Sequence, residues 1–450
     1  MTITWIALLL QGLVVNAFGF HSNTDFLSWL IIFINSLVFL MSMALKYNPP
    51  QLFFIIALGY LARLVLLYVD RTWLGFLIQS GADTESFYWH GLNATELPDR
   101  ISYYGVLFLI FSLFGPQRLI AQYVNLLLGV HTILLGHGIL KKFNHNNPVA
   151  ETVMLMVAMF LPHFMILNVI LLREAVISFS IGLSLFWFIN WFKQNHMIWL
   201  ILSIVAILVA STFHSASFSI AMGYALVIVF YDQKYKEFRF NKSTIIWCVT
   251  LFFAYLIIDD LWGDVLFVQA ARFNDAGDLA DHMARDAAGG AGFSFFIPTG
   301  IPVLDLIVNT PIRAMYFLLA PMPWDWRGFG DIFSFAISSL FYGIFLVTVI
   351  LSIRNPKQEN PELLILLLLV SIMSAMVFSM GVRNAGTAMR HRDKFFVQYV
   401  LMFSLCIGQN IKDHTLSRNK KLHRLLFSQP TTQLGNVTAS CQITHQKRME

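Results

Sequence analysis

Charged residues are scarce in this sequence. Only 12% of its 450 residues are Asp, Glu, Lys or Arg, whereas 57% are hydrophobic. Runs of about twenty apolar residues recur along the chain, and each is long enough to cross the roughly 30 Å hydrocarbon core of a bilayer. The composition therefore indicates a membrane protein with many spans.

Three other absences narrow the class. Alternation of polar and apolar residues with a period of two is missing, which excludes a membrane β-barrel and leaves an all-α bundle. Only three cysteines are present, two in apolar runs and one near the C-terminus, so no disulfide framework is expected. The first apolar run has neither a basic region before it nor an A-x-A cleavage site, so we expect a retained anchor helix and not a signal peptide.

Basic residues between the apolar runs predict the orientation. Short cytoplasmic loops are rich in Lys and Arg, so the connectors at Lys46, Lys141, Lys193 and residues 232–242 are expected to be cytoplasmic. This gives about twelve spans with both termini in the cytoplasm. The expected spans are residues 2–19, 26–45, 51–69, 117–140, 150–171, 174–192, one on each side of residues 211–217, 243–258, 332–352, 362–380 and 395–410.

We expect residues 1–410 to form a single transmembrane bundle. Residues 411–450 hold seven Lys or Arg against one Asp and one Glu. Such a tail is predicted to be a disordered cytoplasmic segment that lies against anionic lipid.

Two apolar stretches do not fit simple spans. Residues 101–114 are too short to cross the bilayer comfortably, and residues 301–323 contain prolines and charges, so both are expected to be interfacial or re-entrant helices. Within the third span, Arg63 is expected to snorkel or to pair with Asp70. The predicted outer face then carries three large loops, residues 70–100, 259–330 and 381–394.

The predicted outer loops use Arg almost to the exclusion of Lys. Residues 381–394 alone hold three arginines, although loops this basic usually stay in the cytoplasm. Arg can donate two parallel hydrogen bonds to phosphate oxygens, and it keeps its charge when it is partly desolvated. The outer face is therefore predicted to bind a lipid phosphate or diphosphate. Its charged residues include Asp83, Glu85, Arg173, Glu174, His214, Arg272, Arg313, Arg327, Arg383, Arg390 and Arg392.

Short motifs in these loops resemble those of polysaccharide enzymes. GADTESFY, which starts at Gly81, looks like the first outer loop of bacterial oligosaccharide repeat-unit polymerases (Wzy-type, including the EpsG-like branch) and of the wider GT-C glycosyltransferases. LLREAVISF before one span and FHSASF after another resemble paired features of the EpsG-like polymerases. FLLAPMPWDW and NAGTAMRHR resemble late-loop motifs of surface-polysaccharide membrane proteins.

The resemblance implies a bacterial inner-membrane enzyme that polymerises a surface polysaccharide such as O-antigen, capsule or exopolysaccharide. It would transfer a glycan from a polyprenyl (undecaprenyl) diphosphate carrier to another lipid-linked repeat unit, without a cofactor and beside a chain-length regulator. Asp83, Glu174 or His214 would take the proton of the acceptor hydroxyl. The residues that would bind the substrate are Arg173, Arg313, Arg383, Arg390, Arg392, Glu85 and Tyr88.

Each catalytic candidate also has a purely structural interpretation. Asp83 could cap a turn, and Arg173 and Glu174 could pair with each other at the start of the sixth span. His214 could simply join two helix ends by a hydrogen bond.

A metal site in the acidic loop is the weaker interpretation of that loop. Asp278, Asp281, His282 and Asp286 have helical spacing that could hold a divalent cation. Acidic loop faces are usually just solvated, so no metal is expected.

Two other functions stay open at this stage. A single-sugar GT-C transferase or a ligase would need one narrow donor pocket, whereas a polymerase needs an outer groove that holds two lipid-linked oligosaccharides. A flippase for lipid-linked glycan would place charges near the bilayer midplane and show internal repeats. The sequence shows no repeat, and its charges crowd at one predicted face.

Overall fold

A computed structural model describes residues 1–19, 25–73, 77, 81–98, 101–143, 147–232, 235–240, 242, 244–246, 248–250, 276–284, 291–292, 295–354 and 360–427. Within these ranges the regular structure is helical, apart from a hairpin of β1 (Tyr231–Asp232) and β2 (Glu237–Phe238). The predicted span over residues 243–258 lies mostly outside the described residues. So do Arg272, Asp286 and the end of the tail, on which other predictions rest.

Seven described helices are long and apolar enough to cross a membrane. They are α2 (Asp25–Lys46), α3 (Pro50–Thr72), α6 (Arg118–Phe143), α9 (Glu174–Gln194), α14 (Pro302–Leu319), the run α15–η4–α16 (Phe329–Ile353) and α17 (Pro361–Gly381). Four other apolar helices are shorter: α1 (Thr2–Ala17), α5 (Tyr103–Phe114), α10 (Met197–Phe213) and η1–α11 (Ser215–Phe230). The chain is therefore a multi-pass helical membrane protein, which confirms the predicted all-α class.

The predicted span over residues 150–171 is broken. It consists of α7 (Pro148–Phe160) and α8 (Pro162–Val169), bent by 55°. Pro162 has no N–H to donate to the Ala158 carbonyl one turn earlier. Arg63 replaces that donor, at 3.2 Å from the Ala158 oxygen and 2.7 Å from the Met159 oxygen. Arg63 thus stays fully buried instead of snorkelling, while Asp70 accepts a hydrogen bond from Gln122 at 2.6 Å.

The stretch predicted to be interfacial or re-entrant, residues 301–323, contains a continuous helix, α14, that is long and apolar enough to span. It accommodates Pro311, and protein groups satisfy its charged residues. Asp305 accepts from the backbone N–H and the hydroxyl of Thr299 at 2.5 and 2.7 Å, and Arg313 donates to three backbone carbonyls. Polar groups are tolerated in apolar helices when protein groups satisfy them.

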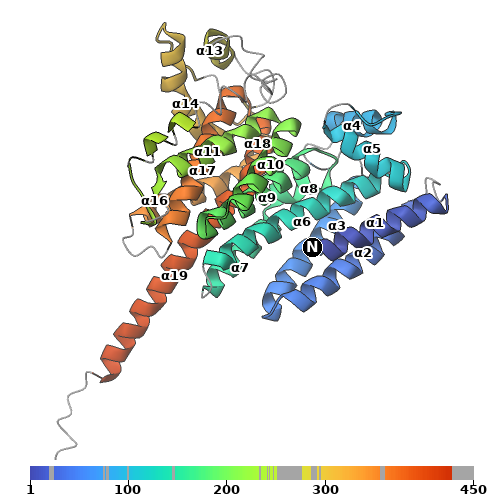
Figure 1. Cartoon of the computed structure of the whole chain (residues 1–450), viewed down its shortest axis with the longest axis horizontal. Helices are drawn as coiled ribbons and strands as arrows, with labels where there is room; N and C mark the ends of the chain where they lie inside the picture. Colours follow the sequence, from blue (N-terminus) through green and yellow to red (C-terminus); the bar gives the residue numbers. More distant parts are fainter. Residues whose placement is uncertain are drawn as a thin grey trace, which may run out of the picture.

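The last helix is longer than predicted. We expected a span ending at residue 410 and a disordered tail, but α19 runs from Phe396 to Phe427. Figure 1 shows it projecting away from the bundle.

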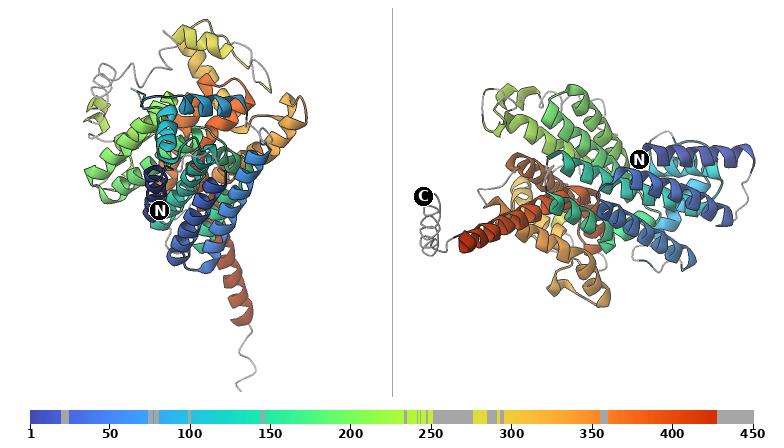
Figure 2. Two further views of the ribbon diagram at one scale, coloured as in Figure 1. Left: turned by 90° about the vertical axis from the view of Figure 1, so that its right-hand side faces the viewer. Right: turned by 90° about the horizontal axis from the view of Figure 1, so that it is seen from below.

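Helix α6 lies at the centre of the bundle. It packs against α3, α7, α8 and α9, and most of its residues are buried inside the bundle. Helices α1, α2 and α3 form one edge of the molecule, and α17 and α19 lie on the other side of α6 (Figures 1 and 2). The short helix α4 (Ala82–Leu92) packs on α5, which packs in turn on α1 and α6.

Two amides of α6 hold the chain between α8 and α9. Gln122 donates to the Val169 carbonyl at 3.2 Å, and Asn125 donates to the carbonyls of Ile170 and Leu172 at 3.0 and 2.8 Å. These bonds satisfy backbone groups that leave the helix, as a buried segment requires. They also fix the place where α9 begins.

Candidate functional site

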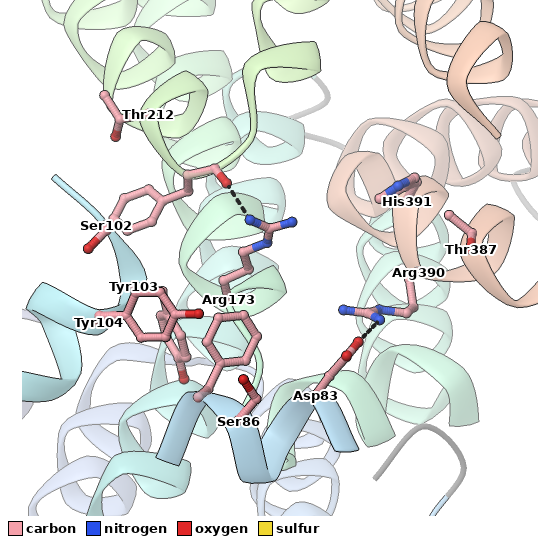
Figure 3. A pocket seen from close by; sticks show the side chains of 12 residues that line it. Asp83, Ser86, Ser102, Tyr103, Tyr104, Arg173, Thr212, Thr387, Arg390 and His391 are labelled. Carbon is pink, nitrogen blue, oxygen red and sulfur yellow. Dashed lines mark hydrogen bonds and ion pairs between the residues drawn. The ribbon is translucent and has the colours of Figure 1, made fainter. Parts of the chain in front are cut away.

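A cavity of about 360 Å³ lies where four connections between apolar helices meet (Figure 3). The walls come from α4, the start of α5, the residue before α9, the end of α10, and α18 (Ala385–Arg392). Segments far apart in the sequence thus enclose one space. The lining residues are Asp83, Ser86, Phe87, Ser102, Tyr103, Tyr104, Arg173, Thr212, Phe213, Thr387, Arg390 and His391.

Arg390 bridges two carboxylates at this cavity. One guanidinium nitrogen lies 2.5 Å from Asp83 Oδ2, and the other lies 3.0 Å from Glu174 Oε1. The Asp83 side chain is 59% exposed, whereas that of Glu174 is 3% exposed. Burial would lower the pKa of Arg390, but Glu174 and Asp83 outweigh it and raise that pKa above its ordinary value.

Helix α18 carries Arg390, and its start is capped. The side chain of Asn384 accepts the backbone N–H of Thr387 at 2.8 Å, which is a standard N-cap. Arg390 and His391 then fall in the last turn, where cations interact favourably with the helix dipole.

Arg173 contributes a second guanidinium. It donates to the carbonyl of Phe213, at the end of α10, at 3.1 Å. Its Nε has no hydrogen-bond partner among the described residues, and neither does the Nε of Arg390. In Figure 3 the rest of the Arg173 guanidinium points toward the open part of the cavity. Two arginines from different elements therefore face one space, and guanidinium groups form strong hydrogen bonds with oxygen anions.

A buried basic cluster lies behind Arg390. Lys394 Nζ is 2.7 Å from His391 Nδ1, and the His391 ring lies 4.8 Å from the His214 ring. Burial lowers the pKa of His391 well below its ordinary value, and the neighbouring Lys394 lowers it further. The pKa of His214 is lowered well below its ordinary value for the same two reasons. Both imidazoles are therefore neutral near pH 7.

The structure brings several predicted residues together. Asp83, Arg173 and Arg390 line the cavity. Glu174 forms an ion pair with Arg390, and His214 packs against His391. Asp83 and Glu174 are both engaged with Arg390, and His214 is only 7% exposed.

Two other predicted residues of α4 lie away from the cavity lining. Glu85 pairs with Arg118 at 2.5 Å, and the Arg118 guanidinium lies over the Tyr88 ring. These two contacts of Arg118 connect α4 to the start of α6.

Three predicted anion-binding arginines also lie outside the lining. Arg392 is fully buried and donates to the carbonyls of Leu318 and Ala320 at 2.6 and 2.9 Å. Arg313 is buried and donates to backbone carbonyls, and Arg383 lies near it. Arg313 and Arg392 thus connect α14 to the segment around α18. The sequence predicts all three as substrate ligands because composition alone does not distinguish such arginines from ones that face a cavity.

His391, Lys394 and the aromatic wall of Phe87, Tyr103 and Tyr104 are not among the residues that the sequence predicts for the site. A signal for the first two existed. Thr387, His391 and Lys394 follow a spacing of four and then three residues, which places them along one side of a helix.

No protein-family model, characterised protein or solved structure matches this chain. Among the described residues, no group of three His, Cys, Asp or Glu is placed to hold a metal ion. The chemistry of the site therefore has to be argued from its own groups. They are two arginines for an anion, a neutral imidazole for a proton, and an aromatic wall with hydroxyls.

Proposed function

We propose that the protein is a membrane glycosyltransferase that polymerises a surface polysaccharide from polyprenyl diphosphate-linked repeat units. The observation that carries the proposal is the meeting of Arg173 and Arg390 at one cavity together with His391. Guanidinium pairs suit phosphate oxygens, and a neutral histidine suits a proton acceptor at neutral pH.

The cavity can accommodate a sugar beside the diphosphate. Phe87 lies 5.0 Å from Tyr103 and 5.5 Å from Tyr104 between ring centroids, and together they form an apolar wall. Ser86, Ser102 and Thr212 add hydroxyl groups near this wall. Apolar surfaces with a few placed polar groups are typical of small-molecule sites of this size.

The transfer step needs only these groups. The acceptor hydroxyl oxygen bonds to the anomeric carbon of the donor as the bond from that carbon to the diphosphate oxygen breaks. The diphosphate leaves with the electron pair, and Arg173 and Arg390 stabilise its growing negative charge. The hydroxyl proton goes to His391, the uncharged base in the cavity lining. Asp83 is less suited to this role because Arg390 already neutralises it.

On the predicted topology of about twelve spans, the cavity faces outward from the bacterial inner membrane. Lys46, Lys141, Lys142 and Lys193 lie at other connections, whereas Lys394 lies beside the cavity. The ammonium of Lys193 donates to the Lys142 carbonyl, and Lys46 lies close enough to Lys141 for their charges to interact. A lysine-rich end opposite an arginine-lined cavity fits cytoplasmic and outer faces respectively.

The test is polymerisation by the purified protein. It would be incubated in lipid nanodiscs with polyprenyl diphosphate-linked repeat units of its own organism, and the products would be separated on a gel. We expect a ladder from the wild type and none from Arg390→Ala, with Arg327→Ala, an exposed arginine that does not line the cavity, as the matched control.

Two results would overturn the proposal. One is a single sugar addition without a ladder, which would favour a single-sugar transferase or a ligase. The other is movement of labelled repeat unit across a proteoliposome membrane without any product, which would favour a flippase.

A further inference from the structure

Lys394 is the most enclosed cation of the site. It belongs to the short turn η5 (Asp393–Phe395) between α18 and α19 and is 1% exposed. Its ammonium position lies 2.7 Å from His391 Nδ1 and over the Phe378 ring of α17 at 5.6 Å. Its polar contact therefore falls on the ring of the proposed base.

Lys394 lies among charges of both signs. Arg173 and Arg390 are cations near it, and Glu174 is a buried carboxylate near it. Glu174 already accepts from Arg390, and the carboxylate of Asp83 pairs with Arg390 at the exposed side. Arginine does not lose its proton in proteins, whereas a buried lysine does so readily. Of the three cations, Lys394 is therefore the one whose charge can change.

Burial lowers the pKa of Lys394 well below its ordinary value. Glu174 opposes that shift, and Arg173 and Arg390 add to it. His391 and His214 are the other titratable groups packed against this cluster, and burial, the largest cause, lowers the pKa of both whether or not Lys394 is charged.

We propose that Lys394 is a positioning residue that, as a neutral amine, accepts a hydrogen bond from Nδ1–H of His391. This fixes the proton of the neutral imidazole on Nδ1 and leaves Nε2 as the atom that takes the proton of the acceptor hydroxyl. The role of this base rests on the proposed function. Which ring nitrogen carries the proton is set by the hydrogen bond at the other one, so a neighbour can switch the base on or off.

A charged Lys394 would act in the opposite way. An ammonium can only donate, so it would donate to Nδ1 and place the imidazole proton on Nε2. His391 could then not accept a proton in the cavity, and Lys394 would serve as a third cation for the diphosphate. The two roles predict opposite effects of the same substitutions.

The test compares Lys394→Gln with Lys394→Arg in the ladder assay. Gln removes the charge but offers an oxygen that accepts from Nδ1–H, so we expect it to keep activity within about tenfold of the wild type. Arg keeps the charge but can only donate, so we expect a loss of about 100-fold or more. Lys394→Met has no acceptor and should fall between them. An active Arg variant beside an inactive Gln variant would overturn the proposal.

A second measurement needs neither activity nor a substituted lysine. The protein would be labelled with ¹⁵N-histidine, and its nitrogen NMR spectrum would be recorded in nanodiscs near pH 7. The chain has 13 histidines, so the His391 signals would be assigned by their loss in His391→Gln. We expect a protonated Nδ1 and a bare Nε2, and the reverse would refute the role of Lys394. If the wild type makes no ladder, the proposed function fails, whereas this spectrum still decides the tautomer.

Discussion

Arg390 and Asp83 form an ion pair with a nitrogen–oxygen distance of 2.5 Å, although they lie 307 residues apart in the sequence. The pair joins α18 to α4 at the cavity, and Arg390 also pairs with the buried Glu174. An anion that binds Arg390 must therefore compete with an exposed carboxylate. We therefore predict that Asp83 acts as a counter-ion of Arg390, and not as the proton acceptor.

Asp83→Asn should bind the lipid-linked donor more tightly. The substitution removes the competing charge, while Glu174 still positions Arg390. We expect KM for the donor to fall about threefold, in keeping with the modest energy of an exposed ion pair, and kcat to change little. Initial rates at varied donor concentration measure both. A collapse of kcat with unchanged KM would instead identify Asp83 as the base.

Arg390→Lys should lose most of the activity although it keeps the charge. A lysine cannot make the planar, two-pronged contact through which Arg390 reaches two groups at once. We expect kcat to fall by about 100-fold, the usual effect of removing a donor that stabilises a developing anion. Arg327→Lys serves as the control for an exposed arginine, and equal effects at both sites would contradict the assignment.

Activity should stay constant through pH 6.5 and fall only at lower pH. His391 must be neutral to accept a proton, and its pKa is lowered well below its ordinary value. Rates measured from about pH 5 to about pH 8 test this. A half-maximal rate at or above about pH 6.5 in the Lys394→Gln variant, where no lysine titrates beside His391, would contradict His391 as the base.

Stability should also decline in acid. In the unfolded chain, His391 and His214 would regain ordinary pKa values of about 6.5, whereas in the folded protein both values are lower. The unfolded state then binds more protons below about pH 6.5, so the free energy of unfolding decreases as the pH falls from that value. The thermal midpoint in detergent measures this, and it should depend less on pH in the His214→Gln, His391→Gln double variant.

Arg63→Met should destabilise the break between α7 and α8. Arg63 is fully buried and donates to the Ala158 carbonyl that Pro162 leaves without its helical partner. Losing a donor to a buried acceptor destabilises by about 1–3 kcal/mol. Pro162→Ala restores a helical N–H, so the double variant should recover part of the loss. Strictly additive effects would show that the two residues are not coupled.

The sequence by itself determined the class of the protein. The chain has apolar runs of bilayer length with few charges. In a bilayer, the backbone of such runs must form helices, because helices satisfy their own hydrogen bonds. Proline and glycine patterns also placed most helix ends near their observed positions, such as the start of α17 after residues 355–359 and the separation of α5 from α6. The stretch from residue 381 to residue 394 stood out through its arginines alone.

Only the tertiary structure decided which of those arginines can meet a ligand. Arg390 and Arg392 are two residues apart, yet one reaches Asp83 at a cavity and the other is enclosed by carbonyls of α14. Residues two apart on a helix point in different directions, and what each direction faces depends on segments that may be hundreds of residues away. The same holds for Lys394, whose pKa depends on its burial and on Glu174 and two arginines that the fold brings near it.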